Sequence, residues 1–149
     1  MATVKPIPDG YTTITPFLNI KGAAEAIDFY KKAFGAEEQN RFTTPAGAIA
    51  ICILKFGNAL VRVSDAVNDP PTTSGLAMYV ENADQAWSRA VDAGCEIVFP
   101  LQNMFFGDRF GILRDPYGNR WSIAQHVEDV SPEEMRRREP EAMRAFQRT

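Results

Sequence analysis

The same order of local patterns, a strand, a helix and three further strands, occurs twice in this chain. The first copy predicts strands over residues 12–20, 41–44, 48–56 and 59–64, with a helix that begins at Gly22 and ends at Gly35. The second predicts strands over 76–80 and 96–99, a helix that ends at Gly94, and a hairpin within 107–125. Neither copy can bury its apolar sheet face alone, so the two copies must cooperate, within one chain or between two chains.

We therefore predict an α+β fold in a single domain of residues 1–149. Its two βαβββ modules cover 12–66 and 74–126, and a C-terminal helical tail covers 127–149. In the tail, Ser131 is the expected N-cap, Pro132 the first helical residue and Glu134 the capping partner. Asn82 and Gln85 give the second helix a similar capping pattern.

The last hairpin has the clearest turn chemistry. In the turn of residues 115–119, Asp115 can accept from backbone N–H groups, Pro116 fixes φ, and Gly118 supplies a positive φ. The strand alternation directs Trp121 outward, toward a covering helix. Residues 100–108 are expected to form a long loop, in which Asp108 and Arg109 stabilise the loop as a pair rather than act in catalysis.

Composition excludes several classes of partner. The chain has 149 residues, a net charge of -3 and 45% hydrophobic residues, so it has material for a core but no basic patch for nucleic acid. No apolar run reaches the length of a membrane span, and residues 1–9 lack the order of a signal peptide, which predicts a cytoplasmic protein. Cys52 and Cys95 are expected to be buried free thiols, and Cys52 has no adjacent His that would make it a nucleophile.

Four segments resemble one family. The helix of residues 27–35, the turn 115–119 and the flanking segments 106–109 and 128–134 are similar to the vicinal oxygen chelate superfamily of glyoxalases, bleomycin-resistance proteins and extradiol dioxygenases, and in particular to its PhnB-like bacterial branch. The resemblance extends from about Thr12 to Arg138. It implies an open eight-stranded cup and a homodimer.

The resemblance also implies four positions for metal ligands. These positions fall here on Thr15, on Arg62 or Ser64, on Gly75 and on Ser122, and the third-strand pair of some relatives falls on Ile51 and Ile53. None is a usual ligand for a transition metal, and the chain has only one histidine. His126 is expected just past the last strand, as an exposed residue of the tail. We therefore predict no metal and no other cofactor.

Residues that alternate along a strand share one face of the sheet, so the aligned positions predict a ligand-binding surface. It contains Phe17, Ile51, Ile53, Arg62, Tyr79, Arg120 and Ser122. A mostly apolar surface with guanidinium groups suits a planar molecule that carries an anionic or carbonyl oxygen. Other interpretations stay open: the isoleucines can be core or dimer contacts, Arg62 can pair with Asp65 or Asp108, and Tyr79 can be structural with its hydroxyl satisfied.

Two functions follow. The first is a metal-free, homodimeric protein that binds a small aromatic or planar ligand, as bleomycin-resistance proteins do. The alternative is an enzyme, either a glyoxalase-like lyase or isomerase or a dioxygenase-related enzyme with a divalent metal, or a metal-free catalyst that uses Tyr79 and Arg62 as acid and oxyanion partner. The sequence assigns no catalytic residue.

Overall fold

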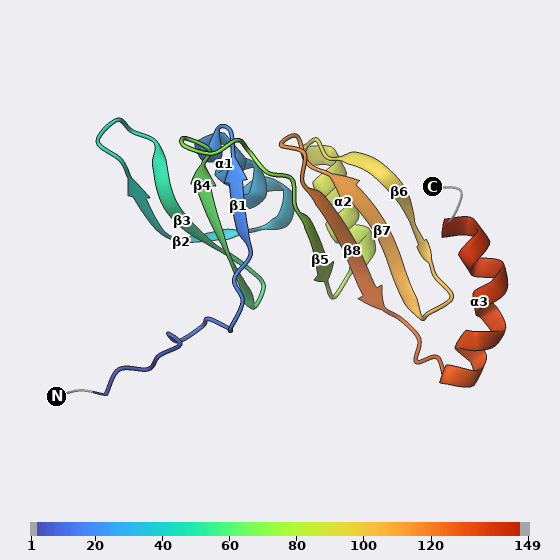
Figure 1. The fold of residues 1–149 in the computed structure, drawn as a ribbon. Helices are drawn as coiled ribbons and strands as arrows, with labels where there is room; N and C mark the ends of the chain where they lie inside the picture. The colour runs from blue at the N-terminus through green and yellow to red at the C-terminus, as the bar shows by residue number, and fades with distance from the viewer. Residues whose placement is uncertain (1–2, 147–149) are drawn as a thin grey trace. The chain divides into compact units, whose positions relative to one another are not determined.

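The computed structural model describes residues 3–146, with side chains up to residue 139. It contains two compact units, one that ends at Ser74 and one that starts at Gly75. Each unit has the order strand, helix and three strands, and the second unit also contains α3 after its last strand (Figure 1). The predicted α+β fold with two βαβββ modules and a C-terminal helix is therefore confirmed.

The first unit is a four-stranded mixed sheet with one helix. Its elements are β1 (Phe17–Ile20), α1 (Ala23–Phe34), β2 (Glu37–Thr43), β3 (Ile49–Phe56) and β4 (Ala59–Asp65). The strand order is β1-β4-β3-β2, with β1 parallel to β4 and the other pairs antiparallel. Helix α1 packs along one face of this sheet (Figure 1), where its buried residues meet a core that includes Leu18, Leu54 and Val63.

Two strand boundaries of the first unit differ from the prediction. β1 begins at Phe17 rather than at residue 12, after Pro16, which has no N–H group to donate to a strand. β2 begins at Glu37 rather than at residue 41. Glutamate has a low strand propensity, but the Glu38 carboxylate pairs with Lys31 and Arg41, and the ladder with β3 outweighs the propensity.

The first helix begins with an unusual cap. Gly22 adopts a left-handed conformation with φ of 82° and provides no side chain for capping. The carboxylate of Asp65, at the end of β4, accepts from the Ala23 N–H at 2.8 Å and from the Ile49 N–H at 2.7 Å. A residue far along the chain therefore fixes the helix start and the start of β3.

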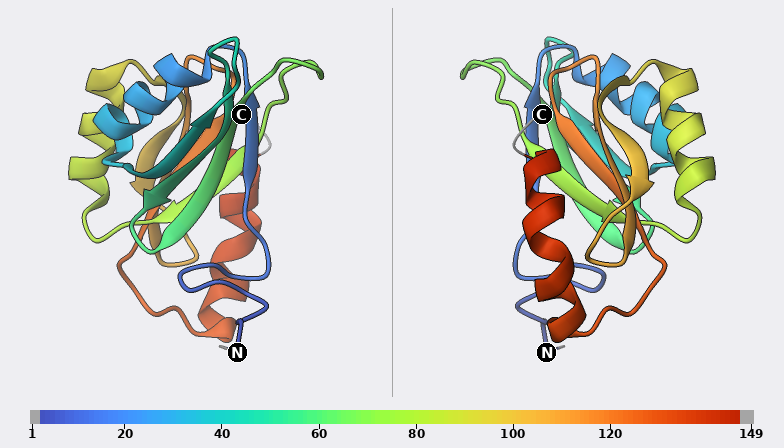
Figure 2. Two further views of the ribbon diagram at one scale, coloured as in Figure 1. Left: turned by 90° about the vertical axis from the view of Figure 1, so that its left-hand side faces the viewer. Right: turned by 90° about the vertical axis from the view of Figure 1, so that its right-hand side faces the viewer.

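The second unit repeats this plan. Its elements are β5 (Gly75–Tyr79), α2 (Ala83–Ala93), β6 (Glu96–Asn103), β7 (Asp108–Arg114) and β8 (Arg120–His126), in the strand order β5-β8-β7-β6. The cross-strand pair Phe17 and Arg62 of the first sheet corresponds to Ala77 and Ser122 of the second. Helix α2 covers one face of its own sheet (Figure 2).

Residues 100–108 do not form the predicted long loop. β6 continues to Asn103, with an irregular register between Phe99 and Gln102 that accommodates Pro100, and only residues 104–107 turn. Asp108 is therefore the first residue of β7. His126 is the last residue of β8, paired with Asp108 across the ladder, and not a tail residue beyond the strand.

The turn between β7 and β8 forms as predicted. Asp115 accepts from the N–H groups of Tyr117 and Asn119 with one carboxylate oxygen and from the Trp121 indole N–H, at 2.9 Å, with the other. Gly118 has a φ of 89°. Trp121 is 1% exposed, so its predicted place in the core is confirmed.

The C-terminal helix α3 (Pro132–Phe146) begins where the sequence predicted, and the Ser131 hydroxyl accepts from the Glu134 N–H at 3.2 Å. Residues 147–149 of the predicted tail lie outside the described range. Between residues 3 and 146, no helix combines the length and the apolar character that a bilayer crossing requires. Cys52 and Cys95 are free and buried, as predicted, and burial raises the pKa of the Cys95 thiol to about 12.

Candidate functional site

Three of the predicted site residues lie next to one another on the face of the first sheet opposite α1. Phe17 on β1 and Ile53 on β3 are both cross-strand partners of Arg62 on β4. The guanidinium carbon of Arg62 is 4.9 Å from the centroid of the Phe17 ring, which is a cation–π contact. Phe17 is 50% exposed and Ile53 is 7% exposed, so Arg62 lies between a half-exposed aromatic ring and a buried aliphatic side chain.

The alternative in which Arg62 pairs with Asp65 is wrong. Both oxygens of the Asp65 carboxylate accept backbone N–H groups, as described above. Arg62 forms no ion pair with any residue of its own unit that the structure describes. Asp108, the other suggested partner, is engaged by residues of the second unit.

Ile51 lies on the same face, further along β3. Its cross-strand partner on β2 is Phe42, which is 60% exposed. Ile51 is half-buried, whereas Ile49 is 3% exposed and belongs to the core. Cys52 is directed to the opposite face, where it is fully buried, as the alternation predicted.

The other predicted residues lie on one face of the second sheet. Ser122, on the central strand β8, lies between Ala77 on β5 and Ile112 on β7. Arg120 lies in the row before it, next to Gly75, and Tyr79 lies in the row after it, next to Ala124. The opposite face packs against α2. There the ring of Trp87, on α2, fills the space beside Gly111 of β7.

Sequence reasoning missed a chain of hydrogen bonds at one end of this face. The Tyr79 hydroxyl donates to Asp108 at 2.6 Å, and the other oxygen of that carboxylate is 2.8 Å from Nδ1 of His126. Nε2 of His126 is 2.7 Å from the Asp129 carboxylate. Asp108 is 4% exposed, so the two neighbours provide partners for a buried charge.

These hydrogen bonds raise the pKa of two side chains, His126 and Tyr79. The bond to Asp108 and, second, the bond to Asp129 raise the pKa of His126, since both favour the imidazolium. The bond to Asp108 also raises the pKa of the Tyr79 hydroxyl, because a phenolate could not donate to the carboxylate. The expected pair of Asp108 with Arg109 does not form: Arg109 binds Asp84 of α2 at 2.8 Å.

A signal for this cluster was present in the sequence. Counting the antiparallel register back from the turn pairs Arg114 with Arg120 and finally Asp108 with His126. The predicted loop includes residue 108 and the predicted hairpin stops at residue 125, so the prediction places the acid in a loop and the imidazole in a tail.

The positions that the family resemblance assigns to metal ligands hold weak side-chain donors or none. Gly75 has no side chain, and the Ser64 hydroxyl donates to the Ala50 carbonyl at 2.7 Å. Within residues 3–139, no three or more His, Cys, Asp or Glu side chains are grouped in a way that could hold a metal ion.

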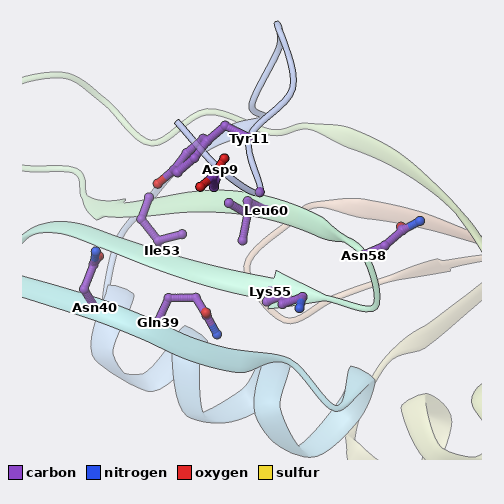
Figure 3. A pocket seen from close by; sticks show the side chains of 9 residues that line it. Asp9, Tyr11, Gln39, Asn40, Ile53, Lys55, Asn58 and Leu60 are labelled. Atoms are coloured by element: carbon purple, nitrogen blue, oxygen red, sulfur yellow. The ribbon is translucent and has the colours of Figure 1, made fainter. Parts of the chain in front are cut away.

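A hollow of about 320 Å³ lies on the same face of the first sheet as Arg62. Ile53 and Leu60 are its apolar residues, and residues 9–11 of the N-terminal segment close one side, with Tyr11 near Ile53 (Figure 3). This segment turns back through a bond from the Tyr11 N–H to the Pro8 carbonyl, at 3.1 Å, next to Gly10 with a φ of 85°.

Polar side chains complete the hollow. Gln39 and Asn40 come from β2, Asn58 from the β3–β4 turn and Lys55 from β3 (Figure 3). Asp9 also lines it, but its carboxylate binds Lys5 at 2.8 Å. The hollow thus combines an apolar floor with amide groups and an ammonium group, the mixture that binding sites for small molecules use.

Two successive βαβββ modules, each with a helix on one sheet face, define a class of α+β proteins built by module duplication. The chain belongs to the Glyoxalase/Bleomycin resistance protein/Dioxygenase superfamily, whose sequence profile matches residues 11–123. It is 34% identical to the uncharacterized protein Mb0911c of Mycobacterium bovis, over 82% of this chain and 88% of that protein. It is equally similar to the uncharacterized protein Rv0887c of Mycobacterium tuberculosis, of which 79% is covered.

Solved structures share the fold at lower identity. TioX from Micromonospora sp. ML1 matches with a TM-score of 0.68 and 24% identity, over 78% of this chain and all of that one. Protein PA1353 from Pseudomonas aeruginosa matches with a TM-score of 0.66 and 19% identity, over 79% and 100%. A PhnB protein from Bacillus cereus matches with a TM-score of 0.57 and 22% identity, over 76% and 99%.

Proposed function

We propose that this protein binds a planar, apolar or aromatic small molecule that carries an anionic or carbonyl oxygen, and that it does so without a metal ion. The proposal extends the superfamily membership to a particular mode of binding. It includes membership of the PhnB-like branch and a homodimer as the working assembly.

One observation carries the proposal: Arg62 stacks on the half-exposed ring of Phe17 and has no ion pair among the described residues of its unit. A guanidinium stacked through its face keeps its N–H groups free at the edge, where they can bind a carboxylate or carbonyl oxygen. The exposed ring and Ile53 offer an apolar surface to the body of such a ligand. Arg62 thus acts as the anchor, and Phe17 as the platform.

We also propose that one face of the second sheet offers a ligand surface like that of the first sheet. Arg120 offers a second guanidinium, and Ser122 offers a hydroxyl on the central strand. We assign Tyr79 to the wall of the surface rather than to proton transfer, since its hydroxyl already donates to Asp108 and its pKa is raised.

The enzyme alternative has less support from the side chains. A metal-dependent lyase, isomerase or dioxygenase needs several imidazole or carboxylate donors, and the corresponding positions hold a threonine, two serines, an arginine and a glycine. The metal-free version needs Tyr79 as an acid, and the bond to Asp108 occupies that proton.

A thermal-shift screen with aromatic acids tests the proposal. We expect 2-naphthoate to raise the melting temperature of the full chain, and Arg62→Gln to abolish the shift, since the anchor is lost. Arg89→Gln, a change on α2, which covers the other face of its own sheet, is the matched control and should leave the shift unchanged. A shift that survives Arg62→Gln would remove Arg62 from the site.

Two further measurements address the metal and the assembly. Elemental analysis of protein purified without chelator should find no stoichiometric zinc, nickel, manganese or iron; near-stoichiometric metal would favour the enzyme instead. Light scattering coupled to gel filtration should give the mass of two chains, and a monomer would contradict the homodimer.

A further inference from the structure

The hollow closed by residues 9–11 contains a second cation that the proposed function does not use. Lys55 lines the hollow, and it forms no ion pair with a described residue of its own unit. The other charged residue of the lining, Asp9, forms an exposed ion pair with Lys5. An ammonium group beside three side-chain amides offers several hydrogen-bond donors to an oxygen-rich group.

The hollow is continuous with the Arg62 surface. Ile53, which lines the hollow, is the cross-strand partner of Arg62, and Leu60, which also lines it, precedes Arg62 by two residues on the same face of β4. Lys55 is the cross-strand partner of Leu60. The two cations therefore lie on adjacent strands and two residues apart, with roughly 8 Å between their Cα atoms.

An acidic residue lies next to the second cation. Glu37 on β2 is the cross-strand partner of Lys55 on the other side, although the two side chains do not form an ion pair. Its carboxylate competes with an anionic ligand for the ammonium group. Removing the Glu37 carboxylate should therefore strengthen the binding of an anionic ligand to Lys55.

We propose that the ligand is a planar diacid, with one carboxylate on the Arg62 guanidinium that stacks on Phe17, its ring over Ile53 and Leu60, and its second carboxylate on Lys55 in the hollow. This inference rests on the proposed function, because it uses Arg62 as the first anchor. It adds a substrate class, aromatic dicarboxylates, and a specificity residue, Lys55. A volume of about 320 Å³ is at the lower end of the range for small-molecule sites and accommodates one polar end of such a ligand.

Isothermal titration calorimetry of the full chain with two probes tests the inference. Naphthalene-2,6-dicarboxylate carries both acids, and 2-naphthoate carries one on the same ring system. We expect the diacid to bind about fivefold more tightly, the effect of one solvated ion pair. Lys55→Met should reduce the diacid to the affinity of the monoacid and leave 2-naphthoate unchanged.

Variants at the neighbouring charges complete the design. Glu37→Gln should tighten the binding of the diacid only, whereas Arg62→Gln should weaken both probes. Equal affinities of the two probes for the unmodified protein, or an equal loss of both in Lys55→Met, would overturn the diacid inference and leave the proposed function intact. Failure of both probes to bind would overturn the proposed function and the inference together.

Discussion

The hydroxyl of Tyr79, at the end of β5, donates a 2.6 Å hydrogen bond to the carboxylate of Asp108, at the start of β7. The bond joins two strands that are not neighbours in the sheet, since β8 lies between them. The same carboxylate binds His126 at the end of β8. Asp108 therefore connects three strands and, through His126 and Asp129, the segment that leads to α3.

Asp108→Asn should destabilise the protein by about 2 kcal/mol, because it removes a buried carboxylate from two charge-assisted or short hydrogen bonds. The free energy of unfolding in urea provides the measurement. Asp69→Asn, in the exposed segment between β4 and β5, is the matched control and should change stability little. Equal stability of Asp108→Asn and the control would show that the cluster does not hold the unit together.

Because hydrogen bonds raise the pKa of His126, we expect the stability of the protein to depend on pH. The folded-state pKa of His126 lies above the usual value for histidine of about 6.5, so its stabilising contribution is fully present below that pH and disappears as the pH rises through the folded-state pKa. His126→Gln should therefore lose stability relative to the unmodified protein at about pH 5.5 and lose little at about pH 8.5, a range in which carboxylates stay charged. Urea unfolding of both proteins at each pH measures the difference. A gap that is larger at the higher pH would contradict the sign.

Gly111→Ala should destabilise the second unit by about 1–3 kcal/mol, the usual cost of overpacking. A Cβ atom there would lie 2.4 Å from the Trp87 ring and 3.0 Å from the backbone of Leu101. Gly75→Ala is the control, since nothing lies within 4 Å of its Cβ position. Thermal unfolding of the two variants should therefore separate them clearly, and a similar melting temperature for both would be evidence against this packing.

Asp65→Ala should cost about 2 kcal/mol, because it leaves two backbone N–H groups, of Ala23 and Ile49, without their acceptor. The equivalent change in the second unit, Gln125→Ala, removes one bond, to the Ala83 N–H at 2.9 Å, and should cost less. Chemical unfolding measures both changes. The reverse order of the two losses would show that the carboxylate is not the main cap of α1.

The sequence predicted most of the architecture but less of the site. Hydrophobic periodicity and turn residues such as Gly118 act locally, so the two modules and the last hairpin could be inferred. The alignment also brought Phe17, Ile53 and Arg62 to one face, as the register confirms. It gave no indication of the hollow, because residues 9–11 carry no pattern that predicts where they pack.

The amino-acid sequence by itself determined the duplicated βαβββ plan and the turn acid Asp115, since each depends on residues close in the chain. Only the tertiary structure decided the partners of Asp65, Asp108 and His126. The hydrogen bonds of Asp65 and Asp108 join residues that are 16 to 42 positions apart, and strand lengths and registers bring such groups together. A buried carboxylate takes whatever donors the fold places beside it, and no local pattern encodes that choice.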